Sequence, residues 1–313
     1  MNHITEQLCW AAGLIVSLLL TPLLPGIINK TKAFFAGRKG PRLLQMYYDI
    51  AKLLKRGSIR STTSGGLVRM APVLNLAVLL AALIFIPFAN SISPFAFTGD
   101  VMLFLYLLGF GRIITVLGAL DTGSAFEGMG ASREVQFSAL AEAATLMICA
   151  FLAVLTSSFS LGGMLLNTLN GPWIAGNAAL IFAAFAMLIV LLTENCRVPF
   201  DDPETHLELT MIHEAMILDN GGPDLALIHY SAALKLWIFS ILLVNMLLPG
   251  AISPAASLLI QPAGVLLVGI VTGIIESTTA RYRFLKVPQM LLTALAFAAL
   301  ALSLLPVFGK VVK

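Results

Sequence analysis

The sequence predicts an all-α integral membrane protein with about eight transmembrane helices and one cytoplasmic amphipathic helix. Of its 313 residues, 58% are hydrophobic and only 11% are charged, whereas soluble domains carry about 25% charged residues. The mean hydropathy is +0.93. Apolar stretches of about 20 residues, long enough to cross a bilayer core as helices, recur along the whole chain. They lie near 8–28, 70–89, 101–120, 136–158, 173–193, 225–248, 255–275 and 287–308.

Basic residues predict how these helices are oriented. Ten of the nineteen Lys and Arg residues lie between Lys30 and Arg69, and most of the others fall in or near every second connection. Basic loops remain in the cytoplasm, so we predict one polytopic domain over 1–313 in the inner membrane, with both termini on the non-cytoplasmic side. The predicted cytoplasmic loops are 29–69, 121–135, 194–224 and 276–286. The basic residues do not form a soluble face, so no nucleic-acid partner is expected.

The first cytoplasmic loop contains the predicted amphipathic helix, which starts at Gly40-Pro41 and stops at Gly57. Proline is common in a first helical turn and glycine just past a last one. One face is apolar, with Leu43, Leu44, Tyr47, Ala51 and Leu54, and the other carries Arg42, Gln45, Asp49, Lys52 and Arg56. Such a helix either lies on the lipid surface or docks a cytoplasmic partner.

A second cytoplasmic segment, 201–223, is predicted to be helical and is rich in ionisable residues. Asp202 suits an N-cap, Pro203 suits the first turn, and Asn220-Gly221-Gly222-Pro223 suits a stop. Its ionisable side chains are Glu204, His206, Glu208, His213, Glu214 and Asp219.

Three ionisable residues fall within or at the end of apolar stretches, namely Glu142, Lys235 and Glu276. Ionisable groups at membrane depth are costly, face the bundle interior and often serve proton or ion movement. We predict that role for Glu142 and Lys235. Glu276 ends its helix, so it either joins them or faces water at the membrane boundary.

Residue spacing argues against a cofactor or metal in this chain. Cys9, Cys149 and Cys196 are far apart and have no metal-ligand spacing. His213-Glu214 begins a zinc-protease pattern, but Ile217 stands where the second histidine would be required.

Four stretches carry a family resemblance. They are Gly37-Arg-Lys-Gly-Pro-Arg-Leu-Leu-Gln45 with Asp49-Ile-Ala-Lys-Leu-Leu54, Leu120-Asp-Thr-Gly-Ser124 with Gly130-Ala-Ser-Arg-Glu134, Glu194-Asn-Cys-Arg-Val-Pro-Phe-Asp201, and Glu204 with Glu208-Leu209. In order and spacing the chain resembles the membrane subunit shared by respiratory NADH dehydrogenase (subunit 1) and group 4 membrane-bound nickel–iron hydrogenases. The short first motif is similar to the hydrogenase type, known as formate hydrogenlyase subunit 4 or hydrogenase-4 component C.

The resemblance implies a coupling and anchoring role. Such a subunit anchors a cytoplasmic arm of hydrogenase-like large and small subunits and an iron–sulfur protein, which hold the [NiFe] centre and [4Fe–4S] clusters. It helps to link their redox chemistry to H⁺ or Na⁺ movement in antiporter-like membrane subunits. Quinone-using relatives form a quinone chamber, so a quinone-chamber subunit is an alternative. A stand-alone secondary transporter is the alternative from another class.

The resemblance also assigns candidate residues. Glu142, Glu194, Asp201, Glu204 and Glu208 match acidic positions of the family, and His206 departs from its pattern. The family's Glu-Tyr-Ser-Gly is absent, and either Asp219-Asn-Gly-Gly or Glu214 stands in its place. With Lys235 and Glu276, these acids are the coupling candidates. The docking candidates are Arg38, Lys39, Arg42, Asp49, Lys52, Arg133, Arg197 and His206.

Overall fold

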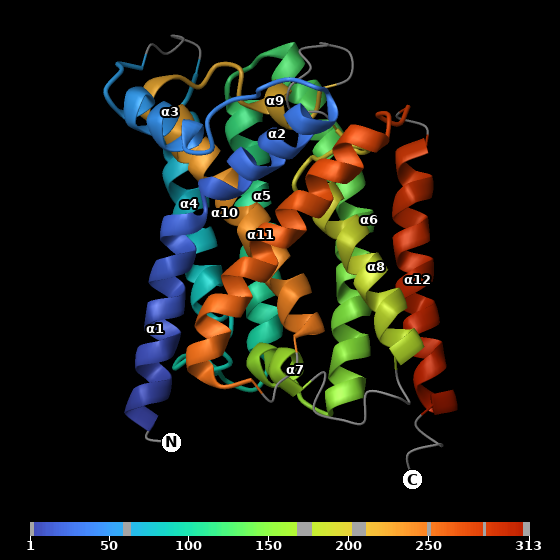
Figure 1. Ribbon diagram of the computed structural model, residues 1–313. Helices are drawn as coiled ribbons and strands as arrows, with labels where there is room; N and C mark the ends of the chain where they lie inside the picture. The colour runs from blue at the N-terminus through green and yellow to red at the C-terminus, as the bar shows by residue number, and fades with distance from the viewer. Residues whose placement is uncertain are drawn as a thin grey trace.

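Helices make up most of the computed structural model, which describes residues 3–58, 64–167, 177–201, 211–248, 252–283 and 286–308 (Figure 1). They are α1 (His3–Leu20), α2 (Leu23–Phe35), α3 (Gln45–Leu54), α4 (Leu67–Ile84), α5 (Asp100–Asp121), α6 (Ala125–Thr156), α7 (Leu161–Asn167), α8 (Asn177–Glu194), α9 (His213–Met216), α10 (Gly222–Leu247), α11 (Pro254–Thr278) and α12 (Val287–Phe308). Within these ranges the only β pairing is an isolated bridge between Phe88 and Ser91. The predicted all-α class is confirmed.

Seven of the eight predicted apolar stretches each overlap with one of these helices, and the first overlaps with both α1 and α2. Six are long and apolar enough to cross a bilayer, namely α4, α5, α6, α10, α11 and α12. The bent pair α1–α2 adds up to one more, and α8 is a shorter apolar helix over Ala179–Glu194. α1 begins and α12 ends at the same end of the bundle, opposite the end that carries α2, α3 and α9 (Figure 1). We call the latter the α3 end. The assignment of the α3 end to the cytoplasm stays a prediction.

The first apolar stretch, 8–28, is not the single helix that we predicted. The chain bends by 49° between α1 and α2. Pro22 lies at the bend and has no backbone N–H, so the carbonyl of Leu18 loses its helical donor. Tyr230 Oη donates to the carbonyl of Leu18 at 3.0 Å, and Tyr47 Oη donates to the carbonyl of Leu19. Side chains of α10 and α3 therefore stabilise the break.

The predicted loop 121–135 is mostly helical. α6 begins at Ala125 and continues for 32 residues, which corresponds to about 48 Å of helix. A bilayer core is only about 30 Å thick. α6 therefore includes both the predicted transmembrane stretch and most of the loop that was predicted before it. It is longer than a bilayer core is thick, so the polar residues at its start can lie beyond the bilayer core.

The amphipathic helix is shorter than we predicted. It begins at Gln45 rather than at Pro41, and none of its residues is buried. The segment before this helix passes very close to α2 at Gly26. A Cβ atom on Gly26 would lie only 2.2 Å from the carbonyl oxygen of Leu43. Leu43 and Pro41 both precede Gln45, so the segment that contacts α2 lies outside the helix.

The second predicted cytoplasmic helix is only partly described. Residues 202–210 lie outside the described ranges, and the part that follows them contains the single turn of α9. Gly222 opens α10 instead of ending the preceding segment, and Pro223 lies in the first turn of α10.

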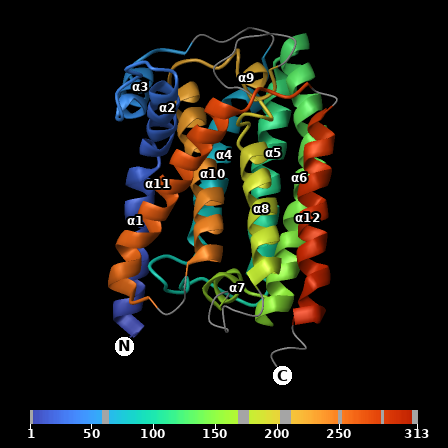
Figure 2. The ribbon, with the colours of Figure 1, turned by 45° about the vertical axis from the view of Figure 1, so that its right-hand side comes forward.

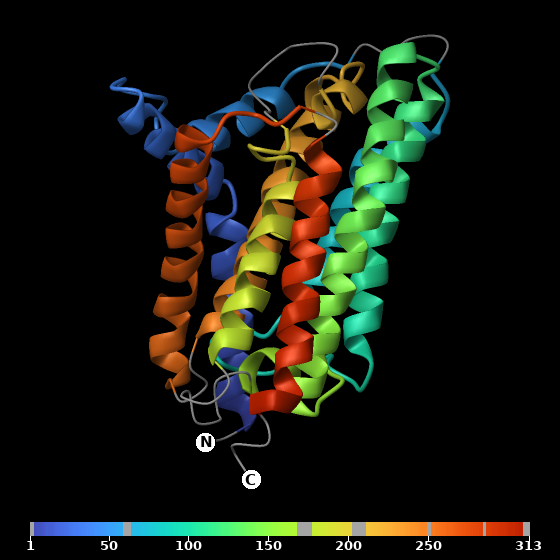
Figure 3. The ribbon, with the colours of Figure 1, turned by 90° about the vertical axis from the view of Figure 1, so that its right-hand side faces the viewer.

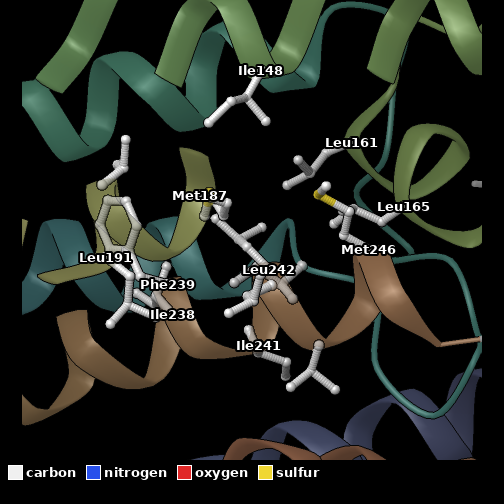
Figure 4. Close-up of a cluster of buried hydrophobic side chains, with 14 of the residues drawn as sticks. Ile148, Leu161, Leu165, Met187, Leu191, Ile238, Phe239, Ile241, Leu242 and Met246 are labelled. Carbon is white, nitrogen blue, oxygen red and sulfur yellow. The ribbon is translucent and has the colours of Figure 1, made fainter. Parts of the chain in front are cut away.

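α10 lies at the centre of the bundle, which explains how it can present a charged residue to the interior. In the 18-residue apolar part of α10, 72% of the residues are buried. In the corresponding part of the other five long helices, the buried share is 39% at most. α10 contacts α4, α8 and α11, and α12 packs on α8 and α6 (Figures 2 and 3). The apolar core around α10 includes Phe239, Leu242, Met187 and Leu191 (Figure 4).

Near the end of the bundle opposite α3, a neutral network of amides is buried beside this core. Gln261 Nε2 and Asn245 Nδ2 each donate to the carbonyl of Pro87 at 3.0 Å. Gln261 Nε2 also donates to Asn245 Oδ1, and Gln261 Oε1 accepts from the backbone N–H of Ala89 at 3.0 Å. We call these residues the amide network. It joins α10 and α11 to the loop that follows α4 without any charge.

Candidate functional site: buried ion pairs and two cavities

Glu194, the last residue of α8, is held by cations from two other helices. Arg112 Nη2, from α5, donates to both carboxylate oxygens at 2.7 Å. Lys235 Nζ, from α10, lies 2.9 Å from Oε2. The Glu194 side chain is only 3% exposed. Arg112 and Lys235 therefore supply the compensation that a buried carboxylate requires.

Arg112 also contacts two carboxylates of α6. Its Nη1 donates to Glu142 Oε1, and its Nε lies 3.9 Å from Glu134 Oε1. The side chain of Glu142 is 51% exposed, whereas that of Glu134 is 11% exposed. We call Arg112, Glu134, Glu142, Glu194 and Lys235 the inner cluster. Within it two cations face three carboxylates, so its formal charge is −1 when all five are ionised.

Three further ion pairs connect α2, α11 and the residue Arg281 after it, and the segment after α8. The buried Glu276 lies 3.3 Å from Lys32 Nζ and 3.6 Å from Arg197 Nη1. The buried Asp201 accepts from Arg281 and from the backbone N–H of Ile212. Glu276 therefore lies within the protein and does not face water at the boundary.

A cavity of about 90 Å³ lies against the inner cluster and is lined by Arg112, Glu134, Glu194 and Lys235. We call it the inner cavity. Four of its lining side chains have a buried polar atom with no hydrogen-bond partner in the described structure: Nε of Arg112, Oδ1 of Asn195, Oδ1 of Asn220 and Oγ of Ser231. Buried polar groups of this kind are normally satisfied by water, which needs at least about 10–15 Å³ per molecule. The inner cavity therefore has the room and the polar lining for several water molecules.

A second cavity, of about 550 Å³, lies between α2, α3, α10 and the segment after α8. We call it the outer cavity. Its α3 lining includes Gln45, Asp49 and Lys52. No residue of α3 is buried, so this cavity reaches the surface of the described structure. Arg197, Glu214 and His229 add ionisable groups to its lining.

The two cavities share part of their lining, namely Asn195, Cys196, His213 and Ala232. We call these residues the partition. His213 is half-buried, and its surroundings lower its pKa to about 4, chiefly through burial and also through the positive charge of Lys235. Burial raises the pKa of the Cys196 thiol well above its usual value. Both groups are therefore neutral near pH 7.

The structure brings together most of the predicted coupling residues that it describes. Glu142, Glu194 and Lys235 belong to the inner cluster, while Asp201 and Glu276 form the neighbouring pairs. Glu214 lines the outer cavity. Asp219 is exposed, and its backbone N–H donates to Glu127 Oε1 at 3.0 Å. Glu204, His206 and Glu208 lie outside the described residues.

The predicted docking residues divide into two groups. Arg38 and Lys39 are exposed, and Arg42, Asp49 and Lys52 are exposed at the rim of the outer cavity. Arg133 and Arg197 instead make internal contacts: Arg133 Nη1 donates to the carbonyl of Met211 at 3.0 Å, and Arg197 pairs with Glu276.

Sequence reasoning missed Arg112, Glu134 and His213 as members of the site, and it missed the burial of Glu127. Arg112 carried the same signal as Lys235, because it lies deep within the apolar stretch 101–120, yet we used it only to orient the helices. Glu127 is fully buried although it lies in a predicted loop. Its burial and that of Glu134 follow from the extension of α6, which the sequence pattern did not reveal.

The described residues contain no group of three His, Cys, Asp or Glu side chains that could hold a metal ion. The site gathers carboxylates, an amine, a guanidinium and an imidazole, groups that can exchange protons and ion-pair partners.

These features define a multi-pass membrane protein with a charged interior near the α3 end. A family model described as NADH dehydrogenase matches residues 9–307, and the chain belongs to this family, which includes subunit 1 of complex I. It is 34% identical to hydrogenase-4 component C of Escherichia coli (strain K12) over 300 residues, which is 93% of each chain. It is 29% identical to formate hydrogenlyase subunit 4 of the same organism over 289 residues, covering 90% of this chain and 93% of the relative.

The fold is similar to that of a chain in a solved structure of the membrane-bound sulfane sulfur reductase, an archaeal respiratory membrane complex. The TM-score is 0.79 at 19% sequence identity, over 96% of this chain and 99% of that chain. The family model and the 34% identical relative confirm the family resemblance that the four sequence stretches predicted.

Proposed function

We propose that this chain is the membrane subunit of an energy-converting [NiFe] hydrogenase or formate hydrogenlyase-type complex in the inner membrane. In this role it anchors a peripheral redox arm at the α3 end and helps to link electron transfer to proton or sodium translocation. Two relatives named for hydrogenase-4 and formate hydrogenlyase support the proposal.

The observation that carries the coupling role is the contact of Glu194 with both Arg112 and Lys235. Charges surrounded by protein interact more strongly than charges in water. A proton or an electron that arrives nearby would therefore change the balance between the Arg112–Glu194 and Arg112–Glu142 pairs. Because these residues come from four helices, this cluster can transmit a local change of charge across the bundle.

The docking role is assigned to the exposed residues of the α3 end, which in this proposal faces the cytoplasm. Arg38 and Lys39 are exposed there, and a guanidinium group suits carboxylates or carbonyls of a partner. Arg38→Ala is expected to weaken retention of the arm without unfolding the membrane subunit. Retention is measured by co-purification from membranes through a tag on this chain, with Lys55→Ala, exposed at the end of α3, as the matched control.

The same co-purification tests the proposed function as a whole. The purified complex should contain a nickel–iron large subunit, a small subunit, iron–sulfur proteins and antiporter-like membrane subunits, and it should evolve or oxidise H₂. A stable complex that lacks these partners contradicts the proposal. Ion transport by the isolated chain in liposomes would instead favour a stand-alone transporter.

A second candidate function, a quinone-chamber subunit, is supported by the volume of the outer cavity. Its volume of about 550 Å³ lies within the range of small-molecule sites, about 300–1,000 Å³. The lining combines apolar side chains such as Met46 and Ile50 with the charges of Asp49 and Arg197. Quinone-dependent turnover that stops with inhibitors of quinone chambers would favour this alternative, and turnover indifferent to quinone would exclude it.

A further inference from the structure

We propose that His213 carries protons between the outer and the inner cavity. This inference rests on the proposed function, because it concerns the route by which protons reach the inner cluster of a coupling subunit. It assigns a specific task to a residue that the charged clusters themselves do not include.

The location of His213 is the first argument. It lines both cavities, together with Asn195, Cys196 and Ala232. A proton that passes directly through this partition must pass a side chain able to accept and release it. An amide and a methyl group cannot do so near pH 7, and burial raises the pKa of the Cys196 thiol. His213 is the group of the partition suited to this exchange.

The inner side of the partition offers a continuation of the path. Asn195 and Ser231 each have a buried polar atom with no hydrogen-bond partner among the described residues, and both line the inner cavity. Waters that satisfy these atoms would share the cavity with Glu134 and Glu194. A proton released by His213 would therefore meet water first and a carboxylate of the inner cluster next.

The outer side offers a source. The outer cavity is lined by Glu214, His229 and Arg197 as well as by exposed residues of α3. The α3 lining connects this cavity to the surface, so protons from bulk water can reach His213 without crossing the apolar core.

The chemistry uses the two nitrogens of a neutral imidazole. One nitrogen accepts a proton from a hydronium ion or an acid of the outer cavity, and the other then releases its own proton to water in the inner cavity. One N–H bond forms and one breaks, and the ring returns to its first tautomer by exchange or rotation. Burial and the positive charges of Lys235 and Arg197 disfavour the intermediate imidazolium, so the proton moves on and does not remain.

The test uses the intact complex in proteoliposomes, with proton translocation measured during H₂-linked electron transfer. His213→Ala should lower the translocation rate by roughly 100-fold, the low side of what a positioned proton-transfer group typically contributes. Added imidazole should restore much of this rate, because a free imidazole fits the space left by the side chain and exchanges protons. His213→Gln keeps hydrogen bonding but cannot be protonated, and it should show the same loss.

Gln45→Ala is the control, since Gln45 lines the outer cavity but not the inner one and carries no titratable group. It should translocate at close to the wild-type rate. Wild-type translocation by an assembled His213→Gln complex would overturn the inference, as would a loss in His213→Ala that imidazole does not restore. If the wild-type complex itself does not translocate ions, the proposed function fails, which is a distinguishable result.

Discussion

The two ends of this bundle both bury polar side chains, but they satisfy them in different ways. The amide network of Asn245 and Gln261 is neutral, and its donors and acceptors meet one another and two backbone groups at fixed distances. Toward the α3 end, Arg112 is shared among three carboxylates, and its Nε has no hydrogen-bond partner in the described structure. The inner cavity lies against Arg112, whereas neither described cavity is lined by the amide network.

The comparison indicates which half can change state. Any rearrangement of a neutral, hydrogen-bonded network breaks hydrogen bonds without making better ones. The network therefore fixes the positions of the helices that it joins. A cation shared among several carboxylates beside water can exchange one partner for another. We therefore assign a structural role to the amide network and a switching role to the inner cluster.

The largest effect on stability is expected from removing Arg112. Arg112→Leu leaves Glu194 with Lys235 alone and removes the ion-pair partner of Glu142. Breaking a buried pair in this way typically costs about 3–5 kcal/mol. Thermal unfolding in detergent should show a markedly lower midpoint. The double variant Arg112→Leu, Glu194→Gln should recover part of the loss, and no recovery would contradict the compensation described above.

Acid is expected to have the next largest effect, through His213. The native pKa of about 4 lies below the ordinary histidine pKa of about 6.5, so between these values the unfolded chain binds more protons than the native one. The contribution of His213 is fully present above about pH 6.5 and is lost as pH falls toward 4, with a cost on the order of 2–3 kcal/mol. The unfolding midpoint should fall less between pH 7 and pH 5 in His213→Gln than in wild type. Equal slopes would contradict this assignment.

The amide network should respond more modestly and without any link to protons. Asn245→Leu removes a donor to Pro87 and the acceptor of Gln261, which should cost about 1–2 kcal/mol. Its unfolding midpoint should be lower than that of wild type by a similar amount at pH 7 and at pH 5. A pH-dependent difference would show that the two halves are not distinct in the way described.

The smallest effect on stability is expected for Glu142→Gln. The side chain is half exposed and pairs only with Arg112 among the described residues, so the change should stay within about 1 kcal/mol. Coupling should nevertheless weaken, because Arg112 loses one of its alternative partners. Assembly is checked by co-purification and coupling by ion translocation in proteoliposomes. Wild-type translocation would remove Glu142 from the pathway.

The sequence predicted the positions of most helices and some of the residues of the site. Length and hydropathy alone located the apolar stretches, and membrane depth alone singled out Glu142 and Lys235, which both belong to the inner cluster although the Glu142 side chain is half exposed. The break at Pro22 was not predicted, because its stability depends on Tyr47 and Tyr230 from distant parts of the chain. Hydropathy periodicity cannot report such contacts.

The sequence also could not predict which side chains of the site contact one another. That Glu194 would meet both Arg112 and Lys235 depends on how three helices pack, and no local pattern encodes this packing. His213 was predicted only as one of several ionisable residues of the helical segment 201–223. Its role in the partition follows from Asn195 and Cys196, which are close to it only in the folded chain.

The most direct test of this account is the number of protons translocated per electron by the Glu194→Gln complex, with the Asn245→Leu complex measured alongside. We expect both complexes to assemble and to transfer electrons. The account predicts that the ratio collapses in Glu194→Gln and stays at the wild-type value in Asn245→Leu. A wild-type ratio in Glu194→Gln would contradict the claim that the inner cluster couples the two processes.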